Sequence, residues 1–380
     1  MTCFELGPIR PPSEAESILL RLTRNCHWNK CAFCPVYKGG QFSLRTEAEV
    51  RHDIDAIRRA AEIIYRGLNA SFPDRADNTG VADIFEDLEF GDDITAGCAR
   101  QVAFWVYHGM RSLFLQDADA LVHRTGTLVG ILNYAKDMFP TIGRVTSYSR
   151  AKTLSRKSPE ELASIRAAGL DRIHIGMETG CETVLELMNK GVTREEQVRA
   201  GRNVMAAGFE LSEYFMPGLG GRLNSREHAL ESARVLSEVN PTFIRLRSTV
   251  PVPGTPLFAM MREKAWDPLG EEEKVREIGL FIENLSGITS TVKSDHIMNL
   301  LEEVEGTLPE DRDAMLAVIR KFLAMDRDDR ESFIVGRRIG RYRLLSDYEP
   351  VPEIETLKRR LKDRYMTLDE GILEILANYI

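Results

Sequence analysis

The stretch DRIHIGMETG, residues 171–180, is an apolar run that ends in a polar turn containing glycine. The stretch TREEQVRAGRNVMAAGF, residues 193–209, has apolar residues at helical spacing, and Thr193 at its start is a typical helix cap. The first stretch therefore predicts a strand and the second a helix. Strand and helix in this order form the repeating unit of a parallel sheet with crossover helices.

The same unit recurs on both sides of these residues. Further strands are predicted at residues 112–121, 144–150, 210–221 and 241–258, and one more before residue 26. The other helices are predicted at residues 45–68, 128–139, 158–170 with Ser158 as its cap, and 225–239 with Ser225 as its cap. Six strands alternating with helices predict an α/β fold, a partial (β/α)6 barrel of the TIM type. The polar residues that end each strand are expected at one mouth of this barrel.

The barrel is expected to span residues 1–265, with an acidic, irregular insertion around residues 70–100. Beyond it, residues 266–380 are expected to form a helical C-terminal extension. Its helices are predicted at residues 271–285, 294–306, 309–325, where Pro309 and Glu310 make a good start, and 351–380.

Composition limits the class of protein. The chain has 380 residues, of which 43% are hydrophobic and 28% charged, as in a well-packed soluble protein. No apolar run is long enough for a membrane span, and the first residues lack the features of a secretory signal, so we expect a cytoplasmic protein with reduced thiols. The net charge of −8 argues against a general affinity for nucleic acid.

Three of the six cysteines lie in RNCHWNKCAFCPVYK, residues 24–38. Cys26, Cys31 and Cys34 have the spacing Cx4Cx2C, so one loop can direct three sulfurs to one centre. A closed zinc site needs a fourth ligand, and His27 is so close to Cys26 that joint ligation would strain the loop. A [4Fe–4S] cluster on three thiolates keeps one iron open for a substrate or cofactor, so the spacing favours a cluster over zinc. The isolated Cys3, Cys98 and Cys181 are expected to be ordinary buried thiols.

The cysteine loop and the strands after it, roughly residues 15–265, resemble the radical S-adenosylmethionine (SAM) enzymes. Phe33 occupies the place of the aromatic residue before the last cysteine, although the first gap is one residue longer than the family's Cx3Cx2C. The resemblance extends to HIGMETG with VLELMNKGVT, to FMPGLGG and to VPVPGTPLF. Within the superfamily, the middle of the chain is most similar to the Elp3-like and oxygen-independent coproporphyrinogen oxidase-like group.

The resemblance implies an enzyme with two cofactors, a [4Fe–4S] cluster on Cys26, Cys31 and Cys34, and SAM. The open iron would chelate SAM through its amino and carboxylate groups. Reductive cleavage would then yield a 5′-deoxyadenosyl radical that abstracts hydrogen from an unidentified small-molecule or peptide substrate. An external donor of the flavodoxin or ferredoxin type would supply the electron.

Several side chains are candidates for contacts to SAM or to the substrate. The resemblance places Glu178 towards the polar groups of SAM and the segment containing Val252 near the adenine. Arg245 and Arg247 are two residues apart, so on a strand they face the same side. If that side faces inward, the two buried guanidiniums need anionic partners, which SAM, an acidic substrate or Glu178 would supply. The full set of cofactor-binding candidates is Phe33, Asp117, Ser147, Glu178, Arg245, Arg247 and Val252.

Less specific roles compete with these assignments. Gln116, Asp117 and Asp119 are equally consistent with a turn or a helix cap, and Tyr148 with packing in the barrel wall. His174 is expected to be structural, and His228 to be a satisfied surface histidine. A cluster of polar residues is expected at the start of the helix at residues 294–306. Ser294 or Asp295 is expected to cap this helix, and the others are candidates to line the substrate side of the barrel: His296 and Asn299.

Two other functions stay open. A non-catalytic iron–sulfur or zinc protein that binds a partner explains the cysteines but gives the segments HIGMETG and VPVPGTPLF no purpose. An RNA-modifying radical SAM enzyme is the other alternative, and the acidic balance of the chain weighs against it.

Overall fold

The computed structural model describes residues 3–73 and 78–377. The chain divides into two compact units. The first consists of Met1–Asn29, Val36–Ile175 and Asn203–Glu210, and the second of Lys30–Pro35, Gly176–Arg202 and Leu211–Ile380.

The sheet of the first unit is parallel. Its strands are β1 (Ile18–Arg21), β4 (Ser112–Gln116), β5 (Arg144–Ser149) and the start of β6 (Arg172–Glu178). β4 pairs with β1 and β5, and β5 pairs with β6, all in parallel. Arg21 lies opposite Gln116, so the polar ends of β1 and β4 are neighbours. A short antiparallel ladder of β2 (Thr23–Arg24) and β3 (Ser43–Leu44) lies on either side of the cysteine segment in sequence.

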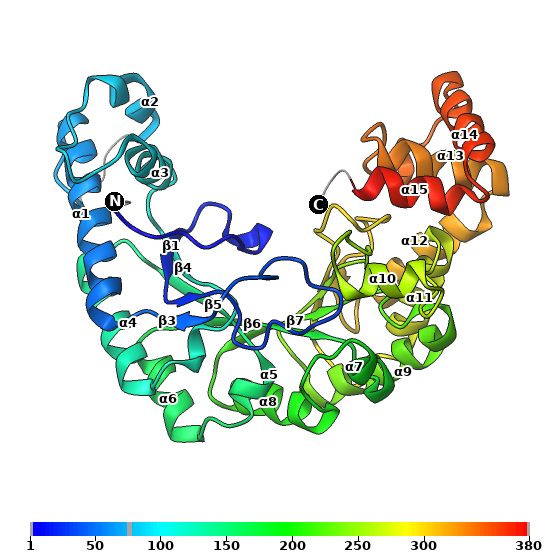
Figure 1. Ribbon diagram of the computed structural model, residues 1–380, viewed down its shortest axis with the longest axis horizontal. Helices are drawn as coiled ribbons and strands as arrows, with labels where there is room; N and C mark the ends of the chain where they lie inside the picture. The colour runs from blue at the N-terminus through cyan, green and yellow to red at the C-terminus, as the bar shows by residue number, and fades with distance from the viewer. Residues whose placement is uncertain (1–2, 74–77, 378–380) are drawn as a thin grey trace. The chain divides into compact units, whose positions relative to one another are not determined.

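The helices of the first unit follow their strands in sequence. They are α1 (Glu47–Gly67), α2 (Val81–Ile84), α3 (Ala96–Tyr107), α4 (Thr125–Met138), α5 (Ala151–Leu154) and α6 (Pro159–Ala167). α1 packs against α3 and α4, and α4 packs against α6 (Figure 1). Thr46 begins α1 and Ser158 begins α6, each with a capping box in which a glutamate three residues later returns a bond to the cap.

The second unit repeats the strand and helix alternation. Its strands are the end of β6, β7 (Glu210–Phe215), β8 (Phe243–Leu246), β9 (Thr291–Lys293) and β10 (Gly306–Thr307). β8 pairs in parallel with β7 and β9, whereas β10 is antiparallel to β9. Its helices are α7 (Glu182–Leu187), α8 (Arg194–Ala206), α9 (Gly221–Val239), α10 (Pro256–Arg262), α11 (Glu271–Asn284), α12 (Arg312–Ala324), α13 (Arg327–Arg338), α14 (Pro352–Arg364) and α15 (Leu368–Ala377).

These elements confirm the predicted α/β fold with a mostly parallel sheet. The six predicted strands are β1, β4, β5, β6, β7 and β8, and each predicted helix before residue 285 is present. In the second unit the core lies between the sheet and the helices α9 and α11, where Phe215 and Phe281 stack at 4.1 Å between ring centroids with no exposed surface. Burial of such large rings stabilises the attachment of α11 to β7.

Three predicted boundaries are wrong. Residues 294–306 form no helix: the Ser294 hydroxyl donates to the Leu301 carbonyl, and the Asn299 amide bonds the end of β8, so these side chains take up the backbone groups of a loop between two short strands. α12 begins at Arg312, after Asp311 and not at Pro309. Ser225 lies inside α9, which begins at Gly221.

The region around residues 70–100 is more helical than expected. The described part contains α2, two short 3-10 turns and the start of α3 at Ala96, where Thr95 accepts a hydrogen bond from the Cys98 amide. Residues 74–77 lie outside the described residues. These helical turns are short and lie among many acidic residues, so they give no hydrophobic periodicity by which the sequence could predict them.

The prediction for the isolated cysteines is wrong for two of them. Cys3 and Cys98 form a disulfide across a separation of 95 residues, because α3 folds against the N-terminal segment. Cys181 is a buried free thiol, as predicted. A separation of this size gives no local signal for pairing.

No helix within residues 3–73 and 78–377 is both long and apolar enough to cross a membrane.

Glu277 on α11 forms hydrogen bonds with the turn after β7 and with α9. Its carboxylate accepts the Gly218 amide at 2.6 Å and the Ser225 hydroxyl, and its Oε1 lies 3.8 Å from Nε2 of His228. Gly218 has φ of 86°, a conformation that favours glycine. Burial raises the pKa of Glu277 to about 7. The folded protein therefore keeps this proton at a pH where the unfolded chain has lost it.

This difference predicts a pH-dependent effect of Glu277→Gln, which preserves the shape of the side chain. Because folding takes up a proton between pH 4.5 and about 7, the wild-type free energy of unfolding should fall relative to the variant as the pH rises through this window. The change should reach at most about 3 kcal/mol. Urea unfolding of both proteins at pH 5, 6 and 7 measures this difference in the free energy of unfolding. His228 is present in both proteins, so its own titration contributes to both unfolding free energies and drops out of the difference. A constant difference across the three values would contradict the assignment.

Candidate functional site

Cys26 lies in the first unit on a tightly turned backbone. Its neighbours Asn25 and Asn29 have φ of 66° and 43°, in the left-handed region that asparagine tolerates. The amide of Asn29 donates to Cys26 Sγ at 3.5 Å, and the amide of Asn25 donates to Asp117 Oδ2 at 2.9 Å. The first cysteine is therefore flanked by fixed backbone on both sides.

Cys31 and Cys34 lie in the second unit, on the segment Lys30–Pro35. The amide of Cys34 approaches the Cys31 carbonyl at 3.4 Å, which brings the chain round between them. Ala32 donates to the Met188 carbonyl at 2.8 Å and accepts from the Leu257 amide at 3.0 Å. Ala32 is buried in an apolar cluster, and Phe33 packs on the same cluster. These contacts hold the segment without using either sulfur.

The three sulfurs suit an iron–sulfur cluster in their chemistry. Cys26, Cys31 and Cys34 are free thiols with intermediate exposure, unlike Cys3 and Cys98, which are joined in a disulfide. Within the part of the chain that the structure describes, no three or more His, Cys, Asp or Glu side chains are grouped to hold a metal ion. The assignment of the three cysteines as ligands therefore stays a prediction that rests on donor type and spacing.

Glu178 ends β6 in the second unit with φ of 65°. Its Oε1 accepts a hydrogen bond from Lys190 Nζ at 3.2 Å, and the same ammonium lies 5.5 Å from the centroid of the Phe33 ring. The side chain folds back over Gly176, where a Cβ would lie 2.1 Å from Glu178 Oε1. Two predicted site residues, Phe33 and Glu178, thus both contact Lys190.

Sequence reasoning missed two members of this group, Lys190 and Glu213. Glu213 on β7 is 3% exposed, and its Oε2 has no hydrogen-bond partner among the residues that the structure describes. Burial, and then the charge of Glu178, raise the pKa of Glu213 well above its usual value, and the charge of Lys190 opposes that rise. Lys190 is the lysine of LMNKG, a segment that the family resemblance had already identified, so its position could have been predicted. Glu213 could have been identified as an acidic residue within a strand expected to be buried.

Arg245 and Arg247 do not behave as a pair. Arg245 is buried on β8, forms an ion pair with Asp295 and donates to the Ser212 hydroxyl at 3.2 Å. Arg247 lies past the end of β8 and is exposed, so the expectation of two guanidiniums on one face of a strand is wrong. Burial, followed by the charge of Arg247, lowers the pKa of His296 to about 4.

The remaining candidates have local partners. Ser147 is fully buried on β5, and its hydroxyl lies within hydrogen-bond distance of the Tyr148 carbonyl, at 2.9 Å, and of the Leu115 carbonyl on β4, at 3.4 Å. Val252 accepts from the Thr255 amide at 3.1 Å in a loop. His228 is satisfied but buried, not at the surface: it contacts the Thr179 hydroxyl at 2.7 Å and the Met216 carbonyl at 3.0 Å. Burial lowers its pKa to about 4.

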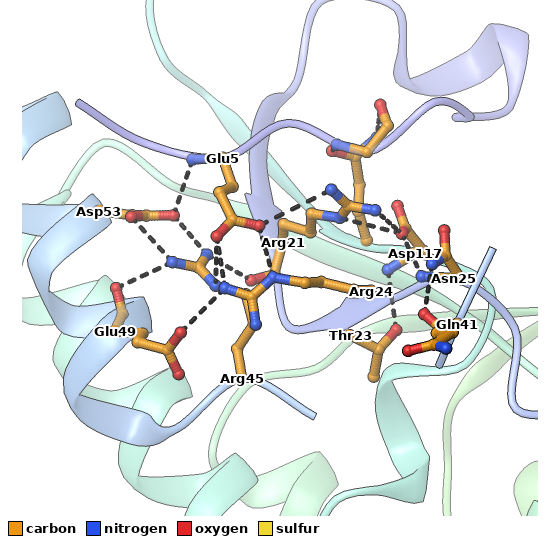
Figure 2. A network of polar contacts seen from close by, with 12 residues as sticks. Glu5, Arg21, Thr23, Arg24, Asn25, Gln41, Arg45, Glu49, Asp53 and Asp117 are labelled. Carbon is orange, nitrogen blue, oxygen red and sulfur yellow. Dashed lines mark hydrogen bonds and ion pairs between the residues drawn. The ribbon is translucent and has the colours of Figure 1, made fainter. Parts of the chain in front are cut away.

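Asp117 lies in the first unit, after β4, with no exposed surface. Its Oδ2 accepts from Arg21 Nη2 at 2.7 Å and from Arg21 Nε at 3.0 Å, besides the Asn25 amide (Figure 2). Burial raises the pKa of Asp117, and the hydrogen bonds from Asn25 and Arg21 oppose that rise. Oδ2 is therefore already partnered by the protein where the sequence predicted a contact to SAM, whereas the buried Oδ1 accepts no hydrogen bond from the residues that the structure describes.

A chain of ion pairs extends from this point (Figure 2). Arg24 donates to Glu49 Oε1 at 2.9 Å and also pairs with Glu5, which lies 3.7 Å from both Arg21 and Arg45. Arg45 in turn bonds Asp53 on α1. Opposite charges alternate along this network, so the N-terminal segment, β1, β2 and α1 are joined with their buried charges compensated.

Comparison with known proteins gives a family. Residues 99–233 match the model of the radical SAM superfamily. This stretch contains Asp117, Ser147 and Glu178 but begins after the three cysteines.

Relatives match over parts of their length. A tRNA uridine(34) acetyltransferase of Methanocaldococcus jannaschii is 22% identical over 31% of this chain and 22% of its own length. A biotin synthase of Porphyromonas gingivalis is 28% identical over 48% of this chain and 51% of its own length. The chain thus spans between about a fifth and a half of these two relatives.

Among solved structures, coproporphyrinogen III oxidase (HemN) of Escherichia coli is similar with a TM-score of 0.45 and 15% identity, over 71% of this chain and 52% of that one. An archaeal Elp3 of Methanocaldococcus infernus has a TM-score of 0.41 and 16% identity, over 57% of this chain and 55% of that one.

The match confirms the predicted resemblance for residues 99–233, and enzymes of this superfamily use a [4Fe–4S] cluster and SAM. Residues 99–233 therefore carry a radical SAM domain.

Proposed function

We propose that this protein cleaves SAM reductively at a [4Fe–4S] cluster held by Cys26, Cys31 and Cys34, and uses the resulting radical on a substrate. The observation that carries the proposal is the set of three free thiols at Cx4Cx2C spacing, in a chain whose residues 99–233 match the radical SAM superfamily. Cluster and SAM together supply a 5′-deoxyadenosyl radical when bound. The residues of the chain bind and orient these groups and exclude water.

In this proposal, the second unit contributes the polar contacts to SAM. Glu178 and Lys190 form an ion pair with 13% and 12% of their side chains exposed, so both charges are partly desolvated and already oriented. A zwitterionic ligand such as the methionyl part of SAM can exchange partners with such a pair at little cost in net charge. Phe33, beneath the Lys190 ammonium, limits where that ammonium can move.

The substrate is proposed to be a small molecule or a peptide, with an electron from a flavodoxin- or ferredoxin-type donor. Arg247, exposed beyond β8, is a candidate for an acidic substrate group, whereas Arg245 is compensated by Asp295. The similarity to tRNA acetyltransferases covers only 22% of the M. jannaschii protein, and the net charge of −8 disfavours RNA as the substrate. A salt-dependent RNA-binding assay distinguishes the two classes.

The cysteine assignment predicts the effect of single substitutions. After anaerobic reconstitution with iron and sulfide, Cys26→Ala, Cys31→Ala and Cys34→Ala should each lose SAM cleavage by more than about 100-fold, because a cluster ligand is missing. Cys181→Ala, at a buried free thiol outside the loop, is the matched control and should keep activity. The readout is 5′-deoxyadenosine per chain, with iron and sulfide content alongside. Full cleavage by any loop variant, or one equivalent of zinc in place of iron, would exclude the assignment.

The Glu178–Lys190 pair predicts a second result. Glu178→Ala should weaken SAM binding to the reconstituted protein about tenfold, because a positioned charged contact is lost. Glu195→Ala, on α8 with 72% of its side chain exposed, is the acidic control and should leave the affinity unchanged. Equilibrium binding of SAM measures both. If Glu178→Ala binds SAM as the wild type does, Glu178 is not part of the SAM site.

A further inference from the structure

The turn after β4 contains two aspartates, Asp117 and Asp119, separated by one alanine. Asp117 accepts the backbone amide of Asn25, the residue before Cys26, at 2.9 Å. Arg21 holds the same carboxylate oxygen from β1 through two hydrogen bonds, at 2.7 and 3.0 Å (Figure 2). The position of the Asn25 amide is therefore fixed by a buried ion pair between two neighbouring strands.

Asp119 acts on the other side of Cys26. Its Oδ2 lies 3.6 Å from Nδ1 of His27, the residue after Cys26, a polar contact that is longer than a hydrogen bond. Asp119 is 1% exposed and is itself oriented by the Ser149 hydroxyl at 2.7 Å and by the Thr153 hydroxyl. A carboxylate with this much support has little freedom to turn towards another ligand.

Arg150 adds a third contact to the same stretch. Its guanidinium lies 3.3 Å from Nε2 of His27 and 5.1 Å from the centroid of the Trp28 ring. Arg150 directly follows β5, next to Ser149. The ends of β4 and β5 thus contact the residues on both sides of Cys26, and the Cys26 sulfur accepts a hydrogen bond from the Asn29 amide.

Asp117 is also covered by the N-terminal segment. A Cβ at Gly7 would lie 1.6 Å from Asp117 Oδ1, so residue 7 must be glycine for this close approach. Gln116 bonds the same segment, accepting from the Gly7 amide at 2.8 Å and donating to the Ile9 carbonyl at 2.7 Å. Arg21 compensates the charge of Asp117.

We propose that the Asp117–Asp119 turn is a positioning element for Cys26, which it fixes through Asn25 and His27, and that Asp117 makes no direct contact to SAM. The inference rests on the proposed function, in which Cys26 is a cluster ligand. It assigns to Asp117 and Asp119 a role that acts through the neighbours of the cysteine, so both are positioning residues.

The test measures the accessibility of each cysteine in the full-length, metal-free protein. Iodoacetamide alkylation, followed peptide by peptide with mass spectrometry, gives separate rates for Cys26, Cys31 and Cys34. Asp117→Ala should raise the Cys26 rate about fivefold, the effect of losing one hydrogen bond. Asp119→Ala, which removes only the 3.6 Å contact to His27, should raise it about threefold, and both variants should leave Cys31 and Cys34 within about twofold of wild type. Asp117→Asn keeps an oxygen that can accept the Asn25 amide and should restore the wild-type rate.

Asp171→Ala is the matched control. Asp171 also accepts a backbone amide, that of Val145 at 2.8 Å, and pairs with Arg166 at 3.0 Å, but it precedes β6. It should leave all three rates unchanged. An unchanged Cys26 rate in both alanine variants, or an equal rise of all three cysteines in them, would overturn the proposal.

A second readout separates this inference from the proposed function. Iron content after reconstitution should fall at least about threefold in the two alanine variants relative to Asp171→Ala. If the wild-type chain holds no cluster, the proposed function fails, and the alkylation rates still decide whether the turn fixes Cys26. If Asp117→Ala does not fold, as judged by circular dichroism, Asp119→Ala and Asp117→Asn carry the test.

Discussion

A carboxylate without exposed surface needs a compensating charge and hydrogen bonds, and Asp117 has both. Its partner Arg21 ends β1, and Asp117 itself follows β4, so the ion pair exists only if these two strands pair in the observed parallel register. The same oxygen holds the Asn25 amide. One interaction thus links strand register, the closely packed N-terminal segment at Gly7 and the backbone that carries the first cysteine.

Each part of the cysteine segment is anchored by backbone groups within its own unit. In the first unit, the anchor is the Asn25 amide on Asp117. In the second unit, it is Ala32, through its amide and carbonyl, with its side chain buried in an apolar cluster. Neither anchor is made through a cysteine sulfur. Rigid support behind reactive side chains is what a site of fixed geometry requires.

The sequence was most informative where short-range physics decides. The alternation of apolar runs and amphipathic segments predicted β1, β4, β5, β6, β7 and β8. Ser158 and Thr46 show that local helix starts follow the capping pattern. The prediction of Ser225 as a helix cap was wrong because the sequence does not distinguish a serine inside a helix from a serine at its start. In the structure, Ser225 lies inside α9 and its hydroxyl bonds Glu277, 52 residues away.

The site was less predictable because its contacts join distant residues. The Cys3–Cys98 disulfide, the pair of Arg245 with Asp295 and the pair of Glu178 with Lys190 all depend on elements that are brought together by folding. Sequence could name Glu178 and Asp117 through the family resemblance, yet it could not show that Asp117 is already partnered by Arg21. Residue type and spacing indicate which chemical groups a site contains. Which side chains form ion pairs and hydrogen bonds with one another depends on the tertiary structure.

The central claim is that three thiolates hold a cluster whose remaining iron is open to SAM. Electron–nuclear double resonance on the reconstituted, reduced protein tests it directly when SAM carries ¹⁵N in its amino group. The account predicts a hyperfine coupling from that nitrogen in the wild type. A reduced cluster that forms in the presence of SAM but shows no such coupling would contradict it, and would favour an electron-transfer or binding role.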